Sequence, residues 1–188
     1  EDFPTITEAP GAAKASIKGS TLAQMIAKTQ FAITGEDTRY YLNGAQFVLG
    51  PEQMTMVATD GHRLALVHAN REGTHKGEDV KAILPRKALA ELGRLLGESD
   101  GEVLYERGEN HLFFEIGPRL LMSRMIDGQF PAYEKVVPKN NDKHIEFERD
   151  RLTNAVKRVA LLSNERSRAV KFQIEKGKVD VTSSSPEV

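Results

Sequence analysis

A strand-like run followed by an amphipathic helix occurs three times in this chain, and no other feature of the sequence constrains its fold as strongly. The three segments are ASIKGSTLAQMIAKTQF from Ala15, KAILPRKALAELGRLL from Lys81 and HIEFERDRLTNAVKRVALL from His144. Their alignment places Ile17, Ile83 and Phe147 at equivalent positions. Each helix has one apolar face, so each needs a sheet to cover it. The repeat therefore predicts an α+β fold of β-α-β-β-β units, with helices on one face of antiparallel sheets.

The expected helices have clear starts and apolar stripes. Ser20 and Asp150 are the expected N-caps of the first and third helices, and Pro85 is tolerated near the first turn of the second. The stripes that we expect to be buried are Leu22, Met25, Ile26 and Thr29 in the first helix, Leu89, Leu92 and Leu96 in the second, and Leu152, Ala155, Val156 and Val159 in the third.

Strand-like runs bounded by turn residues follow each helix. Apart from a hairpin predicted at residues 54–69, they cover residues 40–49, 103–107, 111–116, 120–125, 170–175 and 178–182. We therefore predict one complete two-unit domain at 1–130, a linker at 131–143, and a third unit at 144–188 that is cut short.

The stretch MTMVATDGHRLALVHA, residues 54–69, predicts a β-hairpin. Asp60 and Gly61 suit a two-residue type I′ turn, in which both central residues have a positive φ. The register predicted from that turn pairs Thr59 with His62, Val57 with Leu64 and Thr55 with Leu66. Both faces of such a hairpin are largely apolar, so either a second layer covers the outer face or part of it receives a partner.

Composition narrows the class of protein. Hydrophobic residues make up 39% of the 188 residues and charged residues 28%, which is typical of a globular domain. No apolar run approaches the roughly 20 residues of a membrane span, and residues 1–4 do not resemble a signal peptide. The chain has no cysteine, which fits a cytoplasmic protein. The net charge of −1 means that any binding to nucleic acid depends on local clusters of basic residues.

Basic residues do gather on the helix faces opposite the apolar stripes. They are Lys28 in the first helix, Arg86, Lys87 and Arg94 in the second, and Arg151, Lys157 and Arg158 in the third. If the helices of paired units lie side by side, these cations form a surface for phosphates that cannot read bases. Arg39, Tyr40 and Tyr41 add a basic and aromatic step able to meet backbone or an unpaired base. The alternatives are an ordinary solvated helix face and tyrosines that only pack.

An enzymatic interpretation rests on few residues. Asp60, His62, His68 and His75 suggest a metal or acid–base site, and the alternative function is a small metal-dependent hydrolase that uses Asp60 and His62. Their spacing matches no known catalytic motif, and the turn explains Asp60. We therefore expect neither catalysis nor a metal or cofactor.

Three motifs, VATDGHRLAL, RYYLNG from Arg39 and DGQFPAYEKVVPKNNDKH from Asp127, resemble the bacterial β sliding clamp family. This family supplies the processivity subunit of the replicative DNA polymerase. The resemblance extends over nearly the whole chain and covers the middle domain and the start of the third. It implies the DNA-clamp fold and a non-catalytic head-to-tail homodimeric ring around duplex DNA. It also implies that short linear motifs of DNA polymerases, the clamp loader and repair proteins bind a pocket on the clamp.

Carried over residue by residue, the pocket of this family falls on Leu42, Thr59, Gly61, His62, Arg63, Leu64, Pro131, Lys135 and Val136. Lys135 stands where arginine is common, and Glu36 where known members have glutamine. A head-to-tail ring needs complementary surfaces at both ends of the subunit. The resemblance therefore implies that this chain does not close a ring and is mainly monomeric at micromolar concentration.

Overall fold

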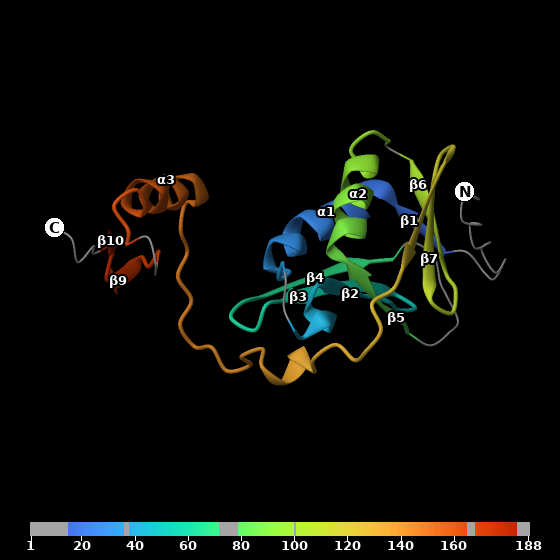
Figure 1. Cartoon of the computed structure of the whole chain (residues 1–188). Coiled ribbons are helices and arrows are strands. Elements are labelled where there is room, and N and C mark those ends of the chain that lie inside the picture. Colours follow the sequence, from blue (N-terminus) through green and yellow to red (C-terminus); the bar gives the residue numbers. More distant parts are fainter. Residues whose placement is uncertain (1–14, 36–37, 72–78, 100, 165–167, 184–188) are drawn as a thin grey trace. The chain divides into compact units, whose positions relative to one another are not determined.

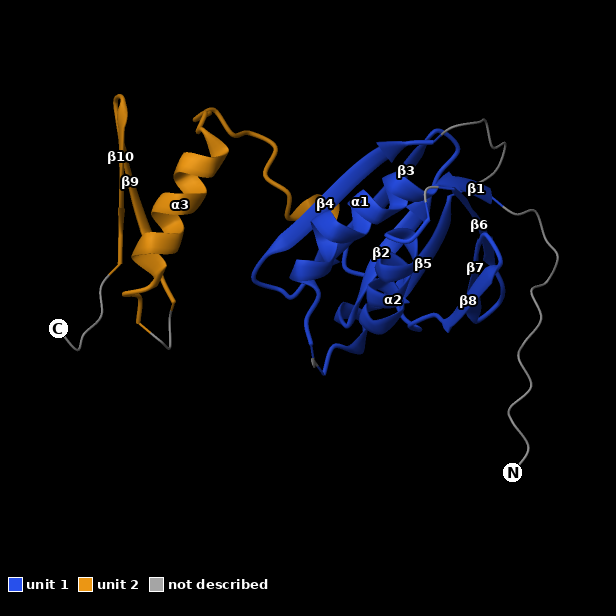
Figure 2. Cartoon of the chain, turned by 90° about the horizontal axis from the view of Figure 1, so that it is seen from above, with its two compact units in different colours: residues 1–132 blue, residues 133–188 orange. Residues whose placement is uncertain are grey.

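A computed structural model describes residues 15–35, 38–71, 79–99, 101–164 and 168–183. The chain forms two compact units, residues 1–132 (unit 1) and 133–188 (unit 2), which Figure 2 colours separately. Glu36 and His75 lie outside the described residues.

Unit 1 contains two β-α-β-β-β repeats, as predicted. The first repeat consists of β1 (Ala15–Lys18), α1 (Gly19–Thr29), the 3-10 helices η1 (Gln30–Ala32) and η2 (Tyr40–Leu42), β2 (Gly44–Leu49), β3 (Gln53–Thr59) and β4 (Leu64–Asn70). The second consists of β5 (Val80–Pro85), α2 (Arg86–Leu96), β6 (Glu102–Arg107), β7 (His111–Ile116) and β8 (Arg119–Arg124).

The first strand of each repeat joins the sheet of the other repeat (Figure 1). One antiparallel sheet has the order β1-β6-β7-β8, and the other has the order β4-β3-β2-β5. A strand of four to six residues has no stability of its own, so it depends on this pairing for its backbone hydrogen bonds. The two repeats therefore form one domain by reciprocal exchange of β1 and β5.

The register of the exchanged strands corrects the predicted alignment. Ile17 of β1 pairs with Val103, and Leu84 of β5 pairs with Ala45. Ile17 and Leu84 each stand two residues before their helix and lie in the main core, whereas Ile83 is outside that core. Because successive strand residues point to opposite faces, a shift of one residue reverses the face. Leu84, and not Ile83, is the equivalent of Ile17.

The main core lies between the paired helices and the sheets. The predicted stripes of α1 and α2 are all buried. Helix α1 packs against α2, β3 and β4, and α2 packs against β2 and β5 (Figure 1). At the centre, the rings of Phe47 and Tyr105 meet edge to face, with centroids 5.6 Å apart. This T-shaped arrangement is favourable for aromatic pairs and joins one sheet to the other.

Two of the predicted helix caps are wrong. Helix α1 begins at Gly19, whose backbone N–H donates to the carbonyl of Gly101 at 3.1 Å, so Ser20 lies within the helix and Lys18 occupies the N-cap position. A Cβ atom on Gly19 would lie 2.5 Å from the Gly101 oxygen, which explains the glycine. In α3 the carboxylate of Glu148, not Asp150, accepts from the first-turn N–H groups.

Unit 2 contains one repeat, with η3 (Tyr133–Lys135), α3 (Arg149–Ala160), β9 (Lys171–Glu175) and β10 (Lys178–Thr182). The strand expected around Phe147 is absent, because the described residues 144–148 join no sheet. In unit 1 the equivalent strands pair with the other repeat, and the described residues of unit 2 form a single repeat. The predicted stripe of α3 is consequently only half-buried.

We predict that Leu89→Ala lowers the free energy of unfolding of unit 1 by about 2–5 kcal/mol, because it leaves a cavity at a fully buried position. Urea denaturation followed by circular dichroism measures the loss. Leu104→Ala is the matched control, since Leu104 is 36% exposed, and it should cost clearly less. Equal losses for the two variants would contradict this description of the core.

Candidate functional site

The loop between β3 and β4 is longer than the sequence predicted. Thr59 pairs with Leu64 and Val57 pairs with Leu66, which leaves the four residues Asp60–Arg63 as the connection. Within this loop only Gly61 has a positive φ, of 86°, whereas a type I′ turn needs two such residues. The predicted register is therefore wrong by two residues. A shift of two preserves the faces, so Leu64 still shares a face with Thr59 and Val57.

Side chains of the loop itself hold it closed. Oδ1 of Asp60 accepts from the backbone N–H groups of His62 and Arg63, both at 3.0 Å. Oδ2 of Asp60 accepts from Nε of Arg63 at 3.1 Å. Oγ1 of Thr59 donates to the carbonyl of Arg63 at 2.7 Å and accepts from the N–H of Gly61 at 3.1 Å. These bonds form an Asx-type turn, which offers its residues a defined conformation at the end of the sheet.

Hydrogen bonds within the loop lower the pKa of the Asp60 carboxyl. The backbone N–H groups of Arg63 and His62, assisted by the Arg63 guanidinium, hold the pKa of the Asp60 carboxyl below its ordinary value of 3.8. The charged carboxylate is thus part of the loop structure. His68, another residue of the enzymatic hypothesis, shares a hydrogen bond of 3.0 Å with Oγ1 of Thr55. Within the described ranges, no three His, Asp or Glu residues are placed to hold a metal ion.

The apolar outer face of the hairpin is covered more fully than the sequence predicted. Val57 is 0% exposed and Thr59 is 9% exposed. Their strand, β3, lies between β2 and β4, whereas β4 lies at the edge of the sheet. Leu64 and Leu66 of β4 remain half-buried on the same face. The accessible apolar surface is therefore confined to the edge strand, directly beside the loop.

The predicted pocket residues other than Leu42 fall into three groups. Thr59, Gly61, His62, Arg63 and Leu64 lie together on the loop and its two strands, with His62 and Arg63 exposed. Pro131 is exposed near the end of unit 1. Lys135 and Val136 belong to unit 2, in η3 and directly after it, and both are exposed.

Leu42 is the pocket residue that differs most from expectation, because it is only 1% exposed. The expected strand at 40–49 starts later, since residues 40–42 form η2 and β2 begins at Gly44. A Cβ atom on Gly44 would lie 2.2 Å from the carbonyl oxygen of Leu84, so glycine permits the close approach of β5. The 3-10 turn lies directly before this contact, and Leu42 is its buried residue.

The structure brings Arg39 to the same loop, although the sequence placed it among the DNA-facing residues. Nη2 of Arg39 donates to the carbonyl of Asp60 at 3.4 Å, and its guanidinium lies beside Gly61. Tyr40 is 55% exposed and contacts Tyr41 edge to face at 5.8 Å. The basic and aromatic step thus adjoins the loop.

Sequence reasoning missed Phe31. It lies in η1, is 58% exposed, and its ring lies 5.8 Å from the guanidinium carbon of Arg63. Arg63 therefore forms an ion pair with Asp60 and a cation–π contact with the exposed ring of Phe31. The only signal in the sequence was an aromatic residue directly after a helix, outside its apolar stripe.

The cations predicted to face DNA differ in their surroundings. Lys28, Arg86 and Lys87 are exposed on α1 and at the start of α2. Arg94 instead forms ion pairs with Glu91 and Glu98, each at 2.6 Å, and its hydrogen bonds to Glu91 raise its pKa. Its charge is locally balanced, so it adds less to a positive surface than Arg86 or Lys87.

The three predicted cations of α3 also lie in different places within unit 2. Lys157 is exposed, whereas Arg151 and Arg158 border a groove between α3 and the β9–β10 hairpin. The positive face of α3 is therefore divided between open surface and groove edge.

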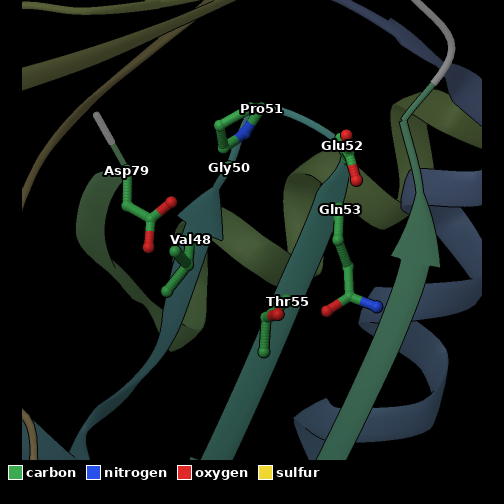
Figure 3. Close-up of a pocket in the computed structure, with 7 residues that line it drawn as sticks. All are labelled: Val48, Gly50, Pro51, Glu52, Gln53, Thr55 and Asp79. Carbon is green, nitrogen blue, oxygen red and sulfur yellow. The ribbon is translucent and has the colours of Figure 1, made fainter. Parts of the chain in front are cut away.

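A second hollow lies at the far end of β3 from the loop (Figure 3). It is lined by Val48, Gly50, Pro51, Glu52, Gln53, Thr55 and Asp79. Figure 3 shows Asp79 across this hollow from Glu52 and Gln53. Two carboxylates repel phosphate, and the mixed polar lining offers no anchor for large apolar side chains. The hollow therefore suits neither DNA nor an apolar peptide.

The architecture is that of a DNA sliding clamp. The DNA polymerase III subunit β of Pseudomonas aeruginosa has a TM-score of 0.93 at 39% identity, over 99% of this chain and 50% of that chain. The DNA polymerase sliding clamp of Bacillus subtilis has a TM-score of 0.91 at 26% identity, over 99% of this chain and 49% of that one.

Sequence comparison identifies the particular family. The central domain of the DNA polymerase III β subunit matches residues 16–132, and its C-terminal domain matches residues 134–188. The β sliding clamps of P. aeruginosa and Escherichia coli K12 are 39% and 36% identical over 186 residues, which are 99% of this chain and 50% of each relative. The chain belongs to the β sliding clamp family of bacterial DNA polymerase III. It spans about half the length of the curated relatives it matches.

No helix within the described ranges is long and apolar enough to cross a bilayer.

We predict that the stabilising effect of the Asp60 charge depends on pH. The pKa of Asp60 is lower in the folded than in the unfolded chain, so the charge stabilises the fold above the unfolded pKa of about 4. This contribution is lost as the pH falls through the folded pKa. Asp60→Asn keeps a side-chain oxygen but removes the charge, so its deficit in unfolding free energy should shrink between pH 6 and strong acid. A deficit that stays constant across this range, measured by urea denaturation, would count against the proposed role of the charge.

Proposed function

We propose that this chain is part of a non-catalytic sliding clamp of the bacterial cytoplasm. The complete protein encircles duplex DNA as a head-to-tail homodimer and tethers the replicative polymerase. The clamp loader and repair proteins share its peptide site. Residues 1–130 form the middle domain, 131–143 the linker, and 144–188 the first half of the third domain. The observation that carries the proposal is the family match over 99% of the chain, combined with an accessible apolar edge beside the Asp60–Arg63 loop.

The peptide site is centred on Leu64. This side chain is half-buried at the edge of a sheet, beside a loop whose conformation is held by Asp60 and Thr59. A half-exposed apolar residue on a rigid element gives an apolar anchor of a peptide a preformed surface. His62 and Arg63 are exposed at the rim, where their donors can fix the orientation of the peptide.

The DNA contact rests on the cations of the helices. Lys28, Arg86 and Lys87 project from helices on one side of the β4-β3-β2-β5 sheet, whereas Leu64 lies on its other side. Long basic side chains on helix surfaces reach phosphates but not base edges. Without a closed ring, such contacts support binding of about 10⁻⁴ to 10⁻⁶ M that weakens with salt.

We predict that Leu64→Ser weakens binding of a polymerase-derived clamp-binding peptide by about 30-fold or more, because a peptide anchor is worth about 2 kcal/mol. Isothermal titration calorimetry measures the affinity. Arg86→Glu, on the helix side of the sheet, is the control and should retain binding. Equal affinity of wild type and Leu64→Ser would remove the hairpin from the peptide site.

We predict that Arg86→Glu combined with Lys87→Glu weakens binding to duplex DNA, because fewer phosphates are neutralised by the helix surface. The slope of log K against log salt should fall in magnitude by about 1 for each phosphate that the variant no longer binds. Fluorescence anisotropy at several salt concentrations measures both quantities. Lys81→Glu reverses one positive charge on the outer face of β5, away from the helices, and should have little effect. Binding that depends on DNA sequence, or that salt does not weaken, would contradict the proposal.

A further inference from the structure

The guanidinium of Arg63 lies over an exposed aromatic ring. The ring belongs to Phe31 in η1, is 58% exposed, and has its centroid 5.8 Å from the guanidinium carbon. The neighbouring residues Thr29, Ala32 and Ile33 are all buried, so they already fix the end of α1 in the core. Because single exposed apolar residues are common on protein surfaces, it is the contact of this ring with a cation that distinguishes it, and not its exposure.

The backbone that carries Phe31 is held in place. At the end of α1, Oγ1 of Thr29 donates to the carbonyl of Met25 at 2.8 Å. The N–H of Ile33 donates to the carbonyl of Gln30 at 3.2 Å and closes the 3-10 turn around Phe31. This turn packs against α1, α2 and β3. The ring therefore starts from a fixed backbone, beside the strand that leads into the candidate site.

Asp60 holds the same guanidinium from its edge. Oδ2 of Asp60 accepts from Nε of Arg63 at 3.1 Å, and Oδ1 is fixed by the backbone N–H groups of His62 and Arg63. An isolated ion pair at a surface holds a long side chain weakly, and the Arg63 side chain is 61% exposed. The ring of Phe31 adds a second restraint. Because a guanidinium is planar, a partner at its edge and a partner at its face together fix its plane.

The two restraints leave the Nη atoms of Arg63 for another partner. Among the described residues, the side chain of Arg63 hydrogen-bonds to Asp60 alone, through Nε. Most N–H donors of a guanidinium lie on Nη1 and Nη2. Arg63 directly precedes Leu64, whose half-buried side chain is the centre of the proposed peptide site. Fixed donors therefore lie one residue from the surface that receives the apolar anchor of a peptide.

We propose that Phe31 is a positioning residue of the peptide site, an inference that rests on the proposed function. It holds the Arg63 guanidinium in the plane in which Nη1 and Nη2 donate to an acceptor oxygen of a peptide anchored on Leu64. Phe31 acts through Arg63 and makes no contact with the peptide itself. A side chain that is ordered before binding loses less conformational entropy when the peptide arrives, so the ring strengthens binding without touching the ligand.

Isothermal titration calorimetry with a polymerase-derived clamp-binding peptide tests this role in the full chain. Phe31→Leu keeps an apolar side chain but removes the π-face, and should weaken binding by about three- to tenfold. Phe31→Tyr restores an aromatic ring and should bind as wild type does. Leu120→Ala is the control, because it truncates another exposed apolar residue of unit 1, in β8, and it should also bind as wild type does.

A double-mutant cycle separates action through Arg63 from direct contact with the peptide. Arg63→Met removes the guanidinium and should itself weaken binding. Phe31→Leu should then have no further effect, because no cation is left to position. A loss from Phe31→Leu that persists in Arg63→Met shows direct contact and overturns the proposal. Equal affinity of wild type and either Phe31→Leu or Arg63→Met overturns it as well.

The same titrations distinguish a failure of this role from a failure of the proposed function. If Leu64→Ser loses binding while Phe31→Leu retains it, the peptide site stands and the role of Phe31 is wrong. If wild type binds no peptide, the proposed function and the role of Phe31 are both wrong.

The contact between Phe31 and Arg63 is measurable without a peptide. The ring current of Phe31 shifts the NMR signals of the Arg63 side-chain protons, and this shift should vanish in Phe31→Leu and persist in Phe31→Tyr. Loss of the shift with unchanged backbone signals elsewhere in unit 1 identifies positioning, since misfolding would move those signals too. Arg63 signals that are the same in wild type and Phe31→Leu would refute the contact.

Discussion

The reciprocal exchange of β1 and β5 is the interaction on which the rest of this structure depends. Each short strand gains backbone hydrogen bonds only by leaving its own repeat, and the exchange draws α1 against α2 over a shared core. The exchange also determines which edge strand of the β4-β3-β2-β5 sheet has no neighbour on its outer side among the described strands. Because β5 covers one edge of the β4-β3-β2-β5 sheet, β4 becomes the open edge, and the Asp60–Arg63 loop with Leu64 stands there. The candidate peptide site is thus a consequence of how the two repeats pair.

The same exchange separates two kinds of chemistry. Cations project from the helices on one side of the sheet, while Leu64 and Leu66 lie on its other side. Local pairing then adjusts each charge. Arg94 is balanced by acids one turn before and after it, and Arg63 is held by Asp60 beside the ring of Phe31. The net charge of −1 conceals this arrangement, because what matters to a phosphate or a peptide is the charge within a few ångströms.

Unit 2 shows the same constraint in an unpaired repeat. Its helix and hairpin form within the boundaries that local pattern predicts, since their hydrogen bonds are made within the repeat. Residues 144–148 do not become a strand, because the partner strand of such a segment belongs to another repeat. Exposure of Phe172 and Ile174 follows from the same cause. Secondary structure in this chain therefore depends partly on local sequence and partly on pairing with another repeat.

The sequence by itself determined the features that depend on neighbours along the chain. Periodicity located the helix stripes from Leu22 to Leu96, and turn residues bounded β7 and β10 at their observed ends. The motifs around Asp60 and Arg39 sufficed for the family. Tertiary structure decided the rest, because those features depend on groups distant in sequence. The helix began at Gly19, whose N–H donates to the carbonyl of Gly101, so Ser20 is not its cap. The Thr59 and Asp60 side chains hold a longer loop than Asp-Gly alone predicted. Residues 40–42 formed a 3-10 turn in which Leu42 is buried, and pairing with Ala45 made Leu84 the equivalent of Ile17 in the repeat. A one-residue change of register reverses a strand's faces, and only the partner strand sets that register.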